Sequence, residues 1–462
     1  MNRKLLRRMT LPLIAACLAL ADCSTNTTTS AGPPTAFAVM RLTSTGGRDI
    51  TFGSGGAGFV TTNIDTTLFD FALAGAIQPA DNKIIAGGSN GLAGQGTIAL
   101  VRYIANGTLD ASGFGIGGIV RTPTPAGWTS ASASAIAVQL GDGKIVVAAL
   151  AFNQTAGTTG IILLRYNTDG TLDTTGFGTS TGFGTFTGFV IANIGPGNMG
   201  DTCGLALQPA DGKILVAGAS TSGNIVLNRY NPDGSPDMAF GTAGTTTTSL
   251  GTSVAAASPA LALQSGGKIV VATGVGDFQN GPADQVVLRY NTGGTLDTGF
   301  GPSGANGIVV TDINATLNFG NAVAVQSDDK IVIAGHANVN FASDTSDISL
   351  VRYNLDGTLD LSFNPTSLTP GIVTTDLGGF DNTFSVALQS PAAANTAILV
   401  SGNTGSGGFS QATALRYNTD GSPDMSFGNG GVVVAPIFGP SSFASGNTVL
   451  QSTLGIVVMG YD

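Results

Sequence analysis

Short runs of β-branched and small apolar residues, separated by Gly, Asn, Asp and Ser, recur along the chain. In one stretch the runs are IVVTDI (308–313), AVAVQ (322–326), KIVIAG (330–335) and ISLVRYN (348–354). Runs of this length and composition, bounded by turn residues, are typical of β-strands. The pattern predicts four strands per repeat, with the first run innermost and the last run outermost in each sheet.

An arginine returns seven times at intervals of 60 to 64 residues, and each is followed eight residues later by an aspartate. The pairs are Arg41 and Asp49, Arg102 and Asp110, Arg165 and Asp173, Arg229 and Asp237, Arg289 and Asp297, Arg352 and Asp360, and Arg416 and Asp424. Seven repeats of four strands predict an all-β fold, a seven-bladed β-propeller with four-stranded blades. We expect each arginine to pair with its aspartate and hold a turn against a strand.

The two ends of the repeat region are complementary. FAVMRL (37–42) matches the ISLVRYN strand, and GIVVMG (455–460) matches KIVIAG. If the N-terminal strand completes the last blade, the ring is closed and no sheet edge stays exposed. We therefore expect a single propeller domain over residues 37–462.

The first residues read as an export signal, because basic residues precede a short apolar run. We assign 1–21 to this signal, with cleavage near 16/17 or 21/22, and 22–36 to a Ser/Thr/Pro-rich tether. Cys17 follows a lipobox-like Ile-Ala-Ala and is a candidate for lipidation. The protein is predicted to be an outer-membrane lipoprotein, a cell-surface protein or an extracellular one, with a membrane contact only through that lipid.

The turns carry a second recurring signature. The motif is RYNxDGTLDxxFG, and residues 352–363 match it up to Phe363. It alternates with hairpins similar to QxxDGKIVVAG throughout the repeat region. This combination resembles the delta-60 repeat family of bacterial β-propellers. The resemblance implies an exported propeller without an established catalytic activity, and it supplies no functional residues.

The Asn-x-Asp-Gly-x-x-Asp part of the motif has two interpretations. Oxygen ligands at alternate positions beside a Gly turn suit a calcium loop. An Asx turn whose last aspartate pairs with the arginine explains the same residues without a metal. We expect no cofactor and no metal, with calcium as the alternative.

Composition restricts the chemistry. The chain has one histidine, His336, expected at a loop edge without a role, and it has no glutamate, so most acid-base sites cannot be assembled. Of 18 basic residues, four lie in the first eight positions and 12 occupy repeat positions, leaving Arg48 and Arg121. With a net charge of −10, this distribution argues against nucleic-acid binding. We predict a monomer that is not an enzyme.

We expect a ligand site on the face that carries the connections whose length varies from repeat to repeat. This face is called the variable-loop face. Aromatic side chains beside carboxylates suit a carbohydrate or a peptide. The candidate residues are Trp128, Asp70, Asp201, Asp277, Asp312, Asp376 and Asp381.

The sequence thus favours a noncatalytic binding or interaction propeller of the cell envelope or the medium, with a glycan or a protein on the variable-loop face. One alternative is a glycan-active hydrolase or lyase that uses loop aspartates, foremost Asp312 and Asp376, which are expected near the channel mouth. Another alternative is an architectural surface protein.

Overall fold

The computed structural model describes residues 35–65, 67–92, 95–178, 188–192, 194, 203–220, 223–251, 255–256, 258–276, 283–313, 317–340, 345–389, 397–406, 409–435, 448–451 and 455–461. The export signal, Cys17 and the tether up to residue 34 lie outside the described residues, so their assignment stays a prediction. Within the described ranges, no helix has the length and apolar character needed to span a bilayer.

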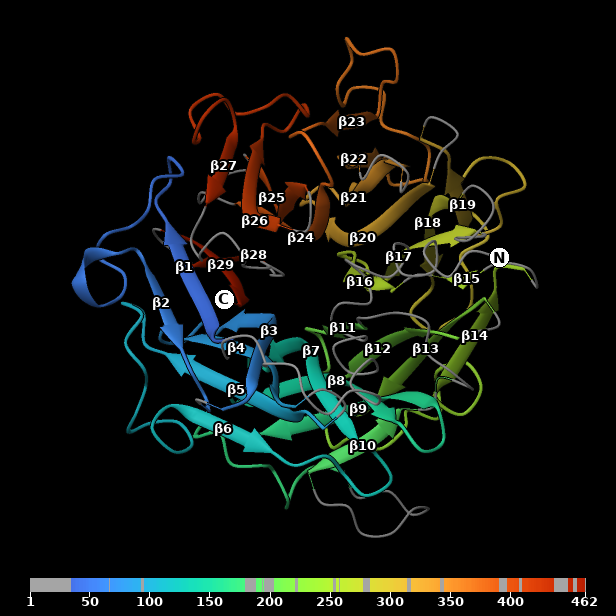
Figure 1. The fold of residues 1–462 in the computed structure, drawn as a ribbon. Coiled ribbons are helices and arrows are strands. Elements are labelled where there is room, and N and C mark those ends of the chain that lie inside the picture. The colour runs from blue at the N-terminus through green and yellow to red at the C-terminus, as the bar shows by residue number, and fades with distance from the viewer. Residues whose placement is uncertain are drawn as a thin grey trace, which may run out of the picture.

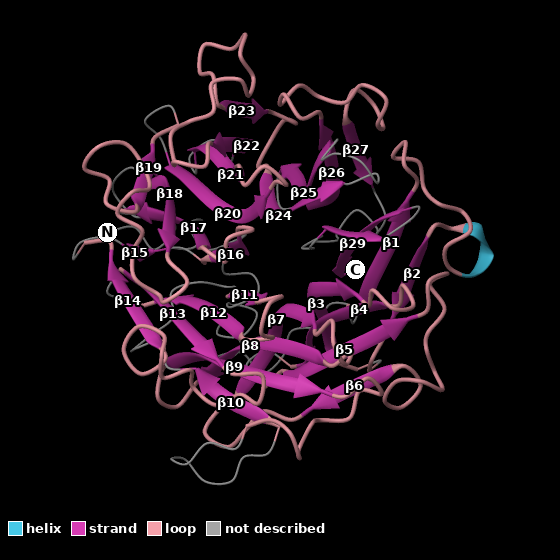
Figure 2. Cartoon of the chain, turned by 180° about the vertical axis from the view of Figure 1, so that it is seen from behind, coloured by secondary structure: helices cyan, strands magenta, loops and turns pink. Residues whose placement is uncertain are grey.

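The chain forms a ring of β-sheets around a central axis (Figure 1). The only helical element among the described residues is a 3-10 turn, η1 (Ser54–Gly56), at the rim (Figure 2). The four-stranded sheets, each given from one edge strand to the other, are β2 (Phe59–Thr62), β1 (Phe37–Leu42), β29 (Gly455–Tyr461), β28 (Thr448–Gln451); β3 (Phe69–Ile77), β4 (Ile84–Gly91), β5 (Thr97–Tyr103), β6 (Ile119–Thr122); β10 (Phe189–Ala192), β9 (Thr158–Tyr166), β8 (Ile145–Asn153), β7 (Ser130–Val138); β11 (Gly204–Leu207), β12 (Ile214–Ala219), β13 (Asn224–Tyr230), β14 (Thr245–Ser249); and β24 (Asn382–Gln389), β25 (Ala397–Ser406), β26 (Phe409–Tyr417), β27 (Val432–Ala435).

The remaining strands form one nine-stranded sheet. Its members are β15 (Ala255–Ala256), β16 (Ala260–Leu263), β17 (Ile269–Gly276), β18 (Ala283–Tyr290), β19 (Ile308–Thr311), β20 (Leu317–Val325), β21 (Ile331–Asn340), β22 (Thr345–Tyr353) and β23 (Ile372–Thr375). A parallel pairing of Ala283 with Leu317 joins β18 to β20 across a repeat boundary. The all-β propeller is confirmed, but the prediction of seven separate four-stranded blades is wrong. The structure has five such blades and this continuous sheet.

The radial order of the strands also differs from the prediction. The strands rich in alternating alanine, such as β3, β7 and β20, lie nearest the axis, and the short IVVT-type strands, such as β6 and β23, lie at the periphery (Figure 1). Small side chains suit the positions where neighbouring sheets converge on the axis, so the alanine-rich run and not the IVVT run is innermost.

The N-terminal and C-terminal strands share one sheet. β1 lies between β2 and β29, and its register runs from Phe37 opposite Tyr461 to Leu42 opposite Ile456. The N-terminal strand therefore completes the last blade, as the complementary ends of the sequence predict.

The core lies between neighbouring blades. In one cluster, Ile85 and Leu100 of β4 and β5 pack with Val147 and Leu164 of β8 and β9, and all four side chains are fully buried. Each sheet thus buries its faces against its neighbours in the ring, as expected of a repeat protein. Cys203 is buried in a similar cluster as a free cysteine.

The repeated arginines link consecutive repeats. All seven predicted Arg–Asp pairs form, with Nε to Oδ2 distances of 2.6 to 2.9 Å, and each guanidinium lies 4.3 to 4.9 Å from the centre of a buried Phe ring. Each Nη1 donates to a backbone carbonyl in the next repeat. The acceptors, in order, are Ala105, Thr168, Pro232, Thr292, Leu355, Thr419 and Ser44.

The propeller has two faces. The variable-loop face carries the connections from outermost to innermost strands and those between strands such as β4 and β5. The opposite face, here called the turn face, carries the Asp-Gly hairpins, such as the one between β7 and β8, and the turns that hold the arginine-paired aspartates. The boundary between two neighbouring blades is called a seam below.

Candidate functional site: an open seam on the turn face

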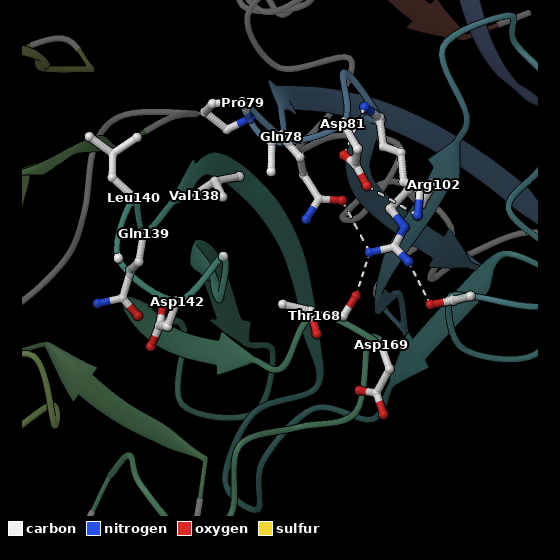
Figure 3. A pocket seen from close by; sticks show the side chains of 15 residues that line it. Gln78, Pro79, Asp81, Arg102, Val138, Gln139, Leu140, Asp142, Thr168 and Asp169 are labelled. Carbon is white, nitrogen blue, oxygen red and sulfur yellow. Dashed lines mark hydrogen bonds and ion pairs between the residues drawn. The ribbon is translucent and has the colours of Figure 1, made fainter.

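A cavity of 530 Å³ opens between two neighbouring blades on the turn face (Figure 3). One wall is the hairpin between β3 and β4, the other is the hairpin between β7 and β8, and the turn after β9 contributes the rest. The lining residues are Gln78, Pro79, Ala80, Asp81, Lys83, Arg102, Gly113, Val138, Gln139, Leu140, Gly141, Asp142, Gly143, Thr168 and Asp169. We call this boundary the open seam.

Gln78 is the buried polar group that faces the cavity, with 6% of its surface exposed. Its Oε1 accepts a hydrogen bond of 3.1 Å from Arg102 Nη1. Arg102 is itself fixed, because Nε donates to Asp110 at 2.9 Å and Nη1 donates to the Thr168 carbonyl. The Gln78 amide is therefore oriented with its oxygen toward Arg102 and its nitrogen toward the cavity (Figure 3), and among the described residues that nitrogen has no hydrogen-bond acceptor.

Two further carboxylates offer acceptor atoms to the cavity. Asp142 Oδ1 accepts from the Lys144 backbone N–H at 3.1 Å. Asp169 Oδ1 accepts from the backbone N–H of Thr171 at 2.9 Å and from its hydroxyl at 2.7 Å. The Thr171 side chain and backbone hydrogen bonds lower the pKa of Asp169, which keeps it ionised at neutral pH. The second oxygen of each carboxylate can accept from a ligand.

Lys83 and Asp81 complete the polar lining. Lys83 Nζ lies 3.2 Å from Asp81 and 3.1 Å from Asp110. Burial alone would raise the pKa of Asp110, but hydrogen bonding from Lys83 and the charge of Arg102 outweigh it and lower the pKa. Both cations of the cavity are therefore committed to carboxylates.

Apolar surface lies among these polar groups. Leu140 is 75% exposed at the edge of the cavity, and Val138 and Pro79 line its inner part (Figure 3). The cavity thus combines amide donors, carboxylate acceptors and apolar patches within a volume of the size that holds small ligands, ~300 to 1,000 Å³.

The seam between the hairpin of β16–β17 and that of β20–β21 is built differently, and we call it the closed seam. Gln264 Nε2 donates to the Asp329 carbonyl at 2.7 Å. The Ser265 backbone N–H donates to Asp329 Oδ1 at 2.8 Å, and the Ser265 hydroxyl donates to Oδ2 at 2.5 Å. The two hairpins are therefore bonded directly to each other.

The two seams differ at two positions and in hairpin length. Gly143 and Asp329 correspond, because each precedes the hairpin lysine, donates its N–H at 2.9 Å to the carbonyl of the hairpin glutamine, and has a positive φ, 71° and 62°. Pro79 stands where the closed seam has Ser265, directly after the glutamine. Glycine has no carboxylate and proline has no N–H or hydroxyl, so the two bonds from Ser265 to the Asp329 carboxylate have no counterpart in the open seam. Both hairpins of the open seam are also one residue longer between the glutamine and the lysine.

Two of the predicted site residues, Asp70 and Asp381, are completely buried and hold loops in place. Asp70 accepts from the Ile64 N–H at 2.7 Å and from Asn90 Nδ2 at 2.6 Å. Asp381 accepts from the Leu377 N–H at 2.7 Å. Burial raises the pKa of each carboxyl to about 6. These contacts are structural, and the two groups do not line the cavity.

Asp312 and Asp376 were expected near the channel mouth. They follow β19 and β23, which are peripheral strands, so the structure places them at the rim (Figure 1). Asp376 Oδ1 accepts from the Gly378 N–H at 2.7 Å, as in an Asx turn. The pair therefore does not converge on the channel as the hydrolase alternative requires.

The remaining candidate residues stay untested as ligand groups. Trp128 is half-buried and packs against the cluster that contains Ile162, so it covers a blade edge. Asp201 and Asp277 lie outside the described residues. Arg121 lies 3.6 Å from Asp65, and Arg48 lies over the Phe59 ring.

His336 is not at a loop edge. It lies within β21, 2% exposed, between the rings of Phe319 and Phe380, with Nδ1 3.0 Å from Asn321 Nδ2. Burial lowers the pKa of the imidazole to about 4, so it is neutral.

The candidate calcium turns use their oxygens internally. In the copy that begins at Asn167, the Asn167 amide donates to the Thr171 hydroxyl at 3.0 Å, Asp169 accepts from Thr171, and Asp173 accepts from Arg165 and Lys144. Among the described residues, no group of three or more His, Cys or Asp side chains is arranged to hold a metal.

Sequence reasoning missed the open seam, because it placed the site on the variable-loop face. The hairpin sequences carry no unique signal for it. QLGDGK (139–144) has a glycine before its lysine where QSDDK (326–330) has an aspartate, but QPADGK (208–213) and QSGGK (264–268) have the glycine as well.

Solved structures similar to the chain share its fold at low sequence identity. A protein of unknown function from Dyadobacter fermentans is 9% identical, with 85% of this chain and 94% of that chain covered and a TM-score of 0.42. An ulvan lyase of polysaccharide lyase family PL25 is 11% identical, with 84% and 92% covered and a TM-score of 0.44. An α-L-arabinofuranosidase from Fusarium graminearum is 9% identical, with 83% and 98% covered and a TM-score of 0.45.

At these identities the likeness concerns the fold alone. It corrects one prediction, that the protein is not an enzyme. The solved structures found similar include a lyase and an α-L-arabinofuranosidase.

No curated protein matches the chain. Six segments match a family model described as "Domain of unknown function (DUF5122) beta-propeller", at residues 80–112, 140–175, 210–240, 264–300, 326–363 and 398–427. The description does not name the delta-60 repeat, which stays a resemblance. What the matches do support is that these six segments are similar to the repeats of a β-propeller family.

Proposed function

We propose that this protein is an exported β-propeller that binds a carbohydrate in the open seam. The observation that carries the proposal is the 530 Å³ cavity between the hairpins of β3–β4 and β7–β8, with the buried Gln78 amide directed into it. The export signal and the possible lipid on Cys17 support a location in the cell envelope or outside the cell.

The lining suits a sugar because it alternates polar and apolar groups. A pyranose presents hydroxyls around its rim and C–H groups on its faces. The Gln78 nitrogen can donate to a hydroxyl, the carboxylates of Asp142 and Asp169 can accept from hydroxyls, and Leu140 and Pro79 offer apolar contact. A ligand that is apolar throughout would leave the buried amide nitrogen unpaired, which costs about 1 to 3 kcal/mol.

Glycan hydrolysis or elimination is the second candidate, and the carboxylates that line the cavity are the observation that favours it. A glycosidase needs one carboxyl that stays protonated near neutral pH. The pKa of Asp169 is lowered, so a general acid would have to be another member of the lining. Binding and catalysis would use the same site. Analysis of the sugar after incubation with the protein distinguishes the two functions.

The test is calorimetric titration of the full chain with neutral, amino and acidic oligosaccharides, followed by chromatography of the sugars. Gly141→Trp adds a large ring to a residue that lines the cavity, and a Cβ at Gly141 meets no atom within 4 Å. Gly266→Trp is the control, since Gly266 also lies two residues after a hairpin glutamine, is equally unobstructed and does not line the cavity.

We expect binding of at least one sugar class by the native protein and by Gly266→Trp, and loss of binding in Gly141→Trp. Unchanged binding in Gly141→Trp would contradict the site. Failure of every sugar class to bind the native protein would contradict the function and favour a protein ligand or an architectural role. Shortened or unsaturated products would identify a hydrolase or a lyase.

A further inference from the structure

We infer that the preferred ligand of the open seam is an amino sugar, whose ammonium group binds Asp142 while a sugar oxygen accepts from Gln78. This inference rests on the proposed carbohydrate-binding function and specifies the substrate class for the same cavity.

The charge of the cavity is negative. Asp81, Asp142 and Asp169 line it with Lys83 and Arg102, and Asp110 lies directly behind both cations. Four carboxylates therefore face two cations. Arg102 Nη2 is 2.8 Å from Asp110 and Lys83 Nζ is 3.1 Å from the same carboxylate, so neither cation is available to an anionic ligand.

Asp142 is the carboxylate left for a cation. In three other hairpins the lysine pairs with the aspartate two residues before it, at 3.2 Å for Lys83 and Asp81, 3.6 Å for Lys213 and Asp211, and 3.9 Å for Lys330 and Asp328. Lys144 pairs instead with Asp173, which lies in the turn that follows β9, at 2.8 Å. Among the described residues Asp142 therefore has no ion pair, although it lines the cavity.

Gln78 provides the second, independent contact. In the closed seam the equivalent Gln264 makes the same bond through its oxygen, to Arg289 at 3.4 Å, and donates from its nitrogen to the Asp329 carbonyl. In the closed seam, the group next to the glutamine nitrogen is therefore an oxygen that accepts its hydrogen bond. In the open seam no described residue accepts from the Gln78 nitrogen, so an oxygen of the ligand can take that place.

An ammonium and several hydroxyls on one small ring satisfy both contacts. A uronate or a phosphorylated sugar would bring a negative charge beside Asp142 and Asp169, where like charges repel. A neutral sugar would make the Gln78 contact and leave Asp142 without a counter-ion. The ranking is therefore amino sugar first, neutral sugar second and acidic sugar last.

The experiment is calorimetry of the full chain with three trisaccharides, of glucosamine, N-acetylglucosamine and galacturonic acid, at low and high salt. We expect the glucosamine trimer to bind about two- to fivefold more tightly than the acetylated one, as for one exposed ion pair. This advantage should shrink at high salt, while the affinity for the acetylated trimer stays constant.

Asp142→Asn tests the assigned residue, and Asp211→Asn, in a hairpin that does not line the cavity, is its control. Asparagine keeps an oxygen for the Lys144 N–H, so the hairpin is preserved. We expect Asp142→Asn to abolish the preference for glucosamine, so that the free and the acetylated trimer bind with equal affinity, and Asp211→Asn to keep the preference of the native protein.

Equal binding of the acetylated and the free amine, or a preference that survives Asp142→Asn, would overturn the inference while leaving the carbohydrate site intact. Tightest binding of the galacturonate trimer would also overturn it. If no sugar class binds the native protein, both this inference and the proposed function fail.

Discussion

The open and the closed seam are built from the same parts and differ in whether the hairpins touch. Both contain a hairpin glutamine whose oxygen accepts from the repeat arginine, at 3.1 Å for Gln78 and 3.4 Å for Gln264. In the closed seam the Asp329 carboxylate accepts two bonds from Ser265 of the neighbouring hairpin, and in the open seam Gly143 has no carboxylate for such bonds. The comparison shows that the same arginine and glutamine contact occurs where neighbouring hairpins bond directly and where a cavity lies between them.

The first prediction compares the arginines of the two seams. Arg102→Ala removes a guanidinium that is 3% exposed and leaves Asp110, Gln78 and the Thr168 carbonyl without it. We expect a loss of about 3 to 5 kcal/mol in the free energy of unfolding, the effect of breaking a buried ion pair. Urea unfolding at neutral pH measures it.

Arg289→Ala removes the same contacts from the closed seam, where Gln264 and Ser265 still bond to Asp329. We expect a smaller loss there than for Arg102→Ala. Equal losses would mean that the direct hairpin contact does not support the closed seam.

The second prediction closes the open seam. The double variant Pro79→Ser, Gly143→Asp gives the open seam the two residues of the closed seam. An aspartate tolerates the positive φ of 71° at position 143, because Asp329 adopts a φ of 62°. We expect sugar affinity to fall by about a hundredfold, or 2.7 kcal/mol, because the new carboxylate occupies the cavity. The control is Pro79→Ser alone, which adds a hydroxyl but no filling group and should retain binding. Retained affinity in the double variant would place the ligand elsewhere.

The third prediction opens the closed seam. Asp329→Gly removes the two carboxylate acceptors of Ser265, and glycine accepts the positive φ without strain. We expect a loss of about 1 to 2 kcal/mol in the free energy of unfolding, from two hydrogen bonds. Asp329→Asn keeps one acceptor oxygen and should lose less. A fully stable Asp329→Gly variant would show that the contact is not stabilising.

Much of the fold follows from the sequence, because each repeat carries its own strand and turn signals. The Arg–Asp spacing predicts pairs that form in every repeat, and the matching ends around Phe37 and Tyr461 predict the shared sheet. The radial order was misjudged because the IVVT-type and alanine-rich runs are both apolar, and only packing near the axis distinguishes them. The sheet count was misjudged because a single pairing, Ala283 with Leu317, merges two repeats.

The site was less predictable. Aspartates in loops, such as Asp70 and Asp381, look like ligand groups in a sequence but turn out to accept buried backbone N–H groups. Gly143 has no carboxylate that could bond the neighbouring hairpin, but Gly212 and Gly267 stand at the same position in other repeats. The cavity depends on the distance between two hairpins that are about sixty residues apart, which a comparison of the repeats in sequence does not show.

The arginine contact that joins consecutive repeats has a consequence for how such a protein evolves. Arg416 donates to the Ser44 carbonyl as Arg102 donates to that of Thr168, so the junction between the two ends of the chain is held by the same arginine contact as the internal junctions. A gene rearrangement that starts the chain at another repeat would recreate the same set of junctions. The order in which the repeats are encoded is therefore free to change, while the position of the open seam relative to its neighbours is inherited unchanged.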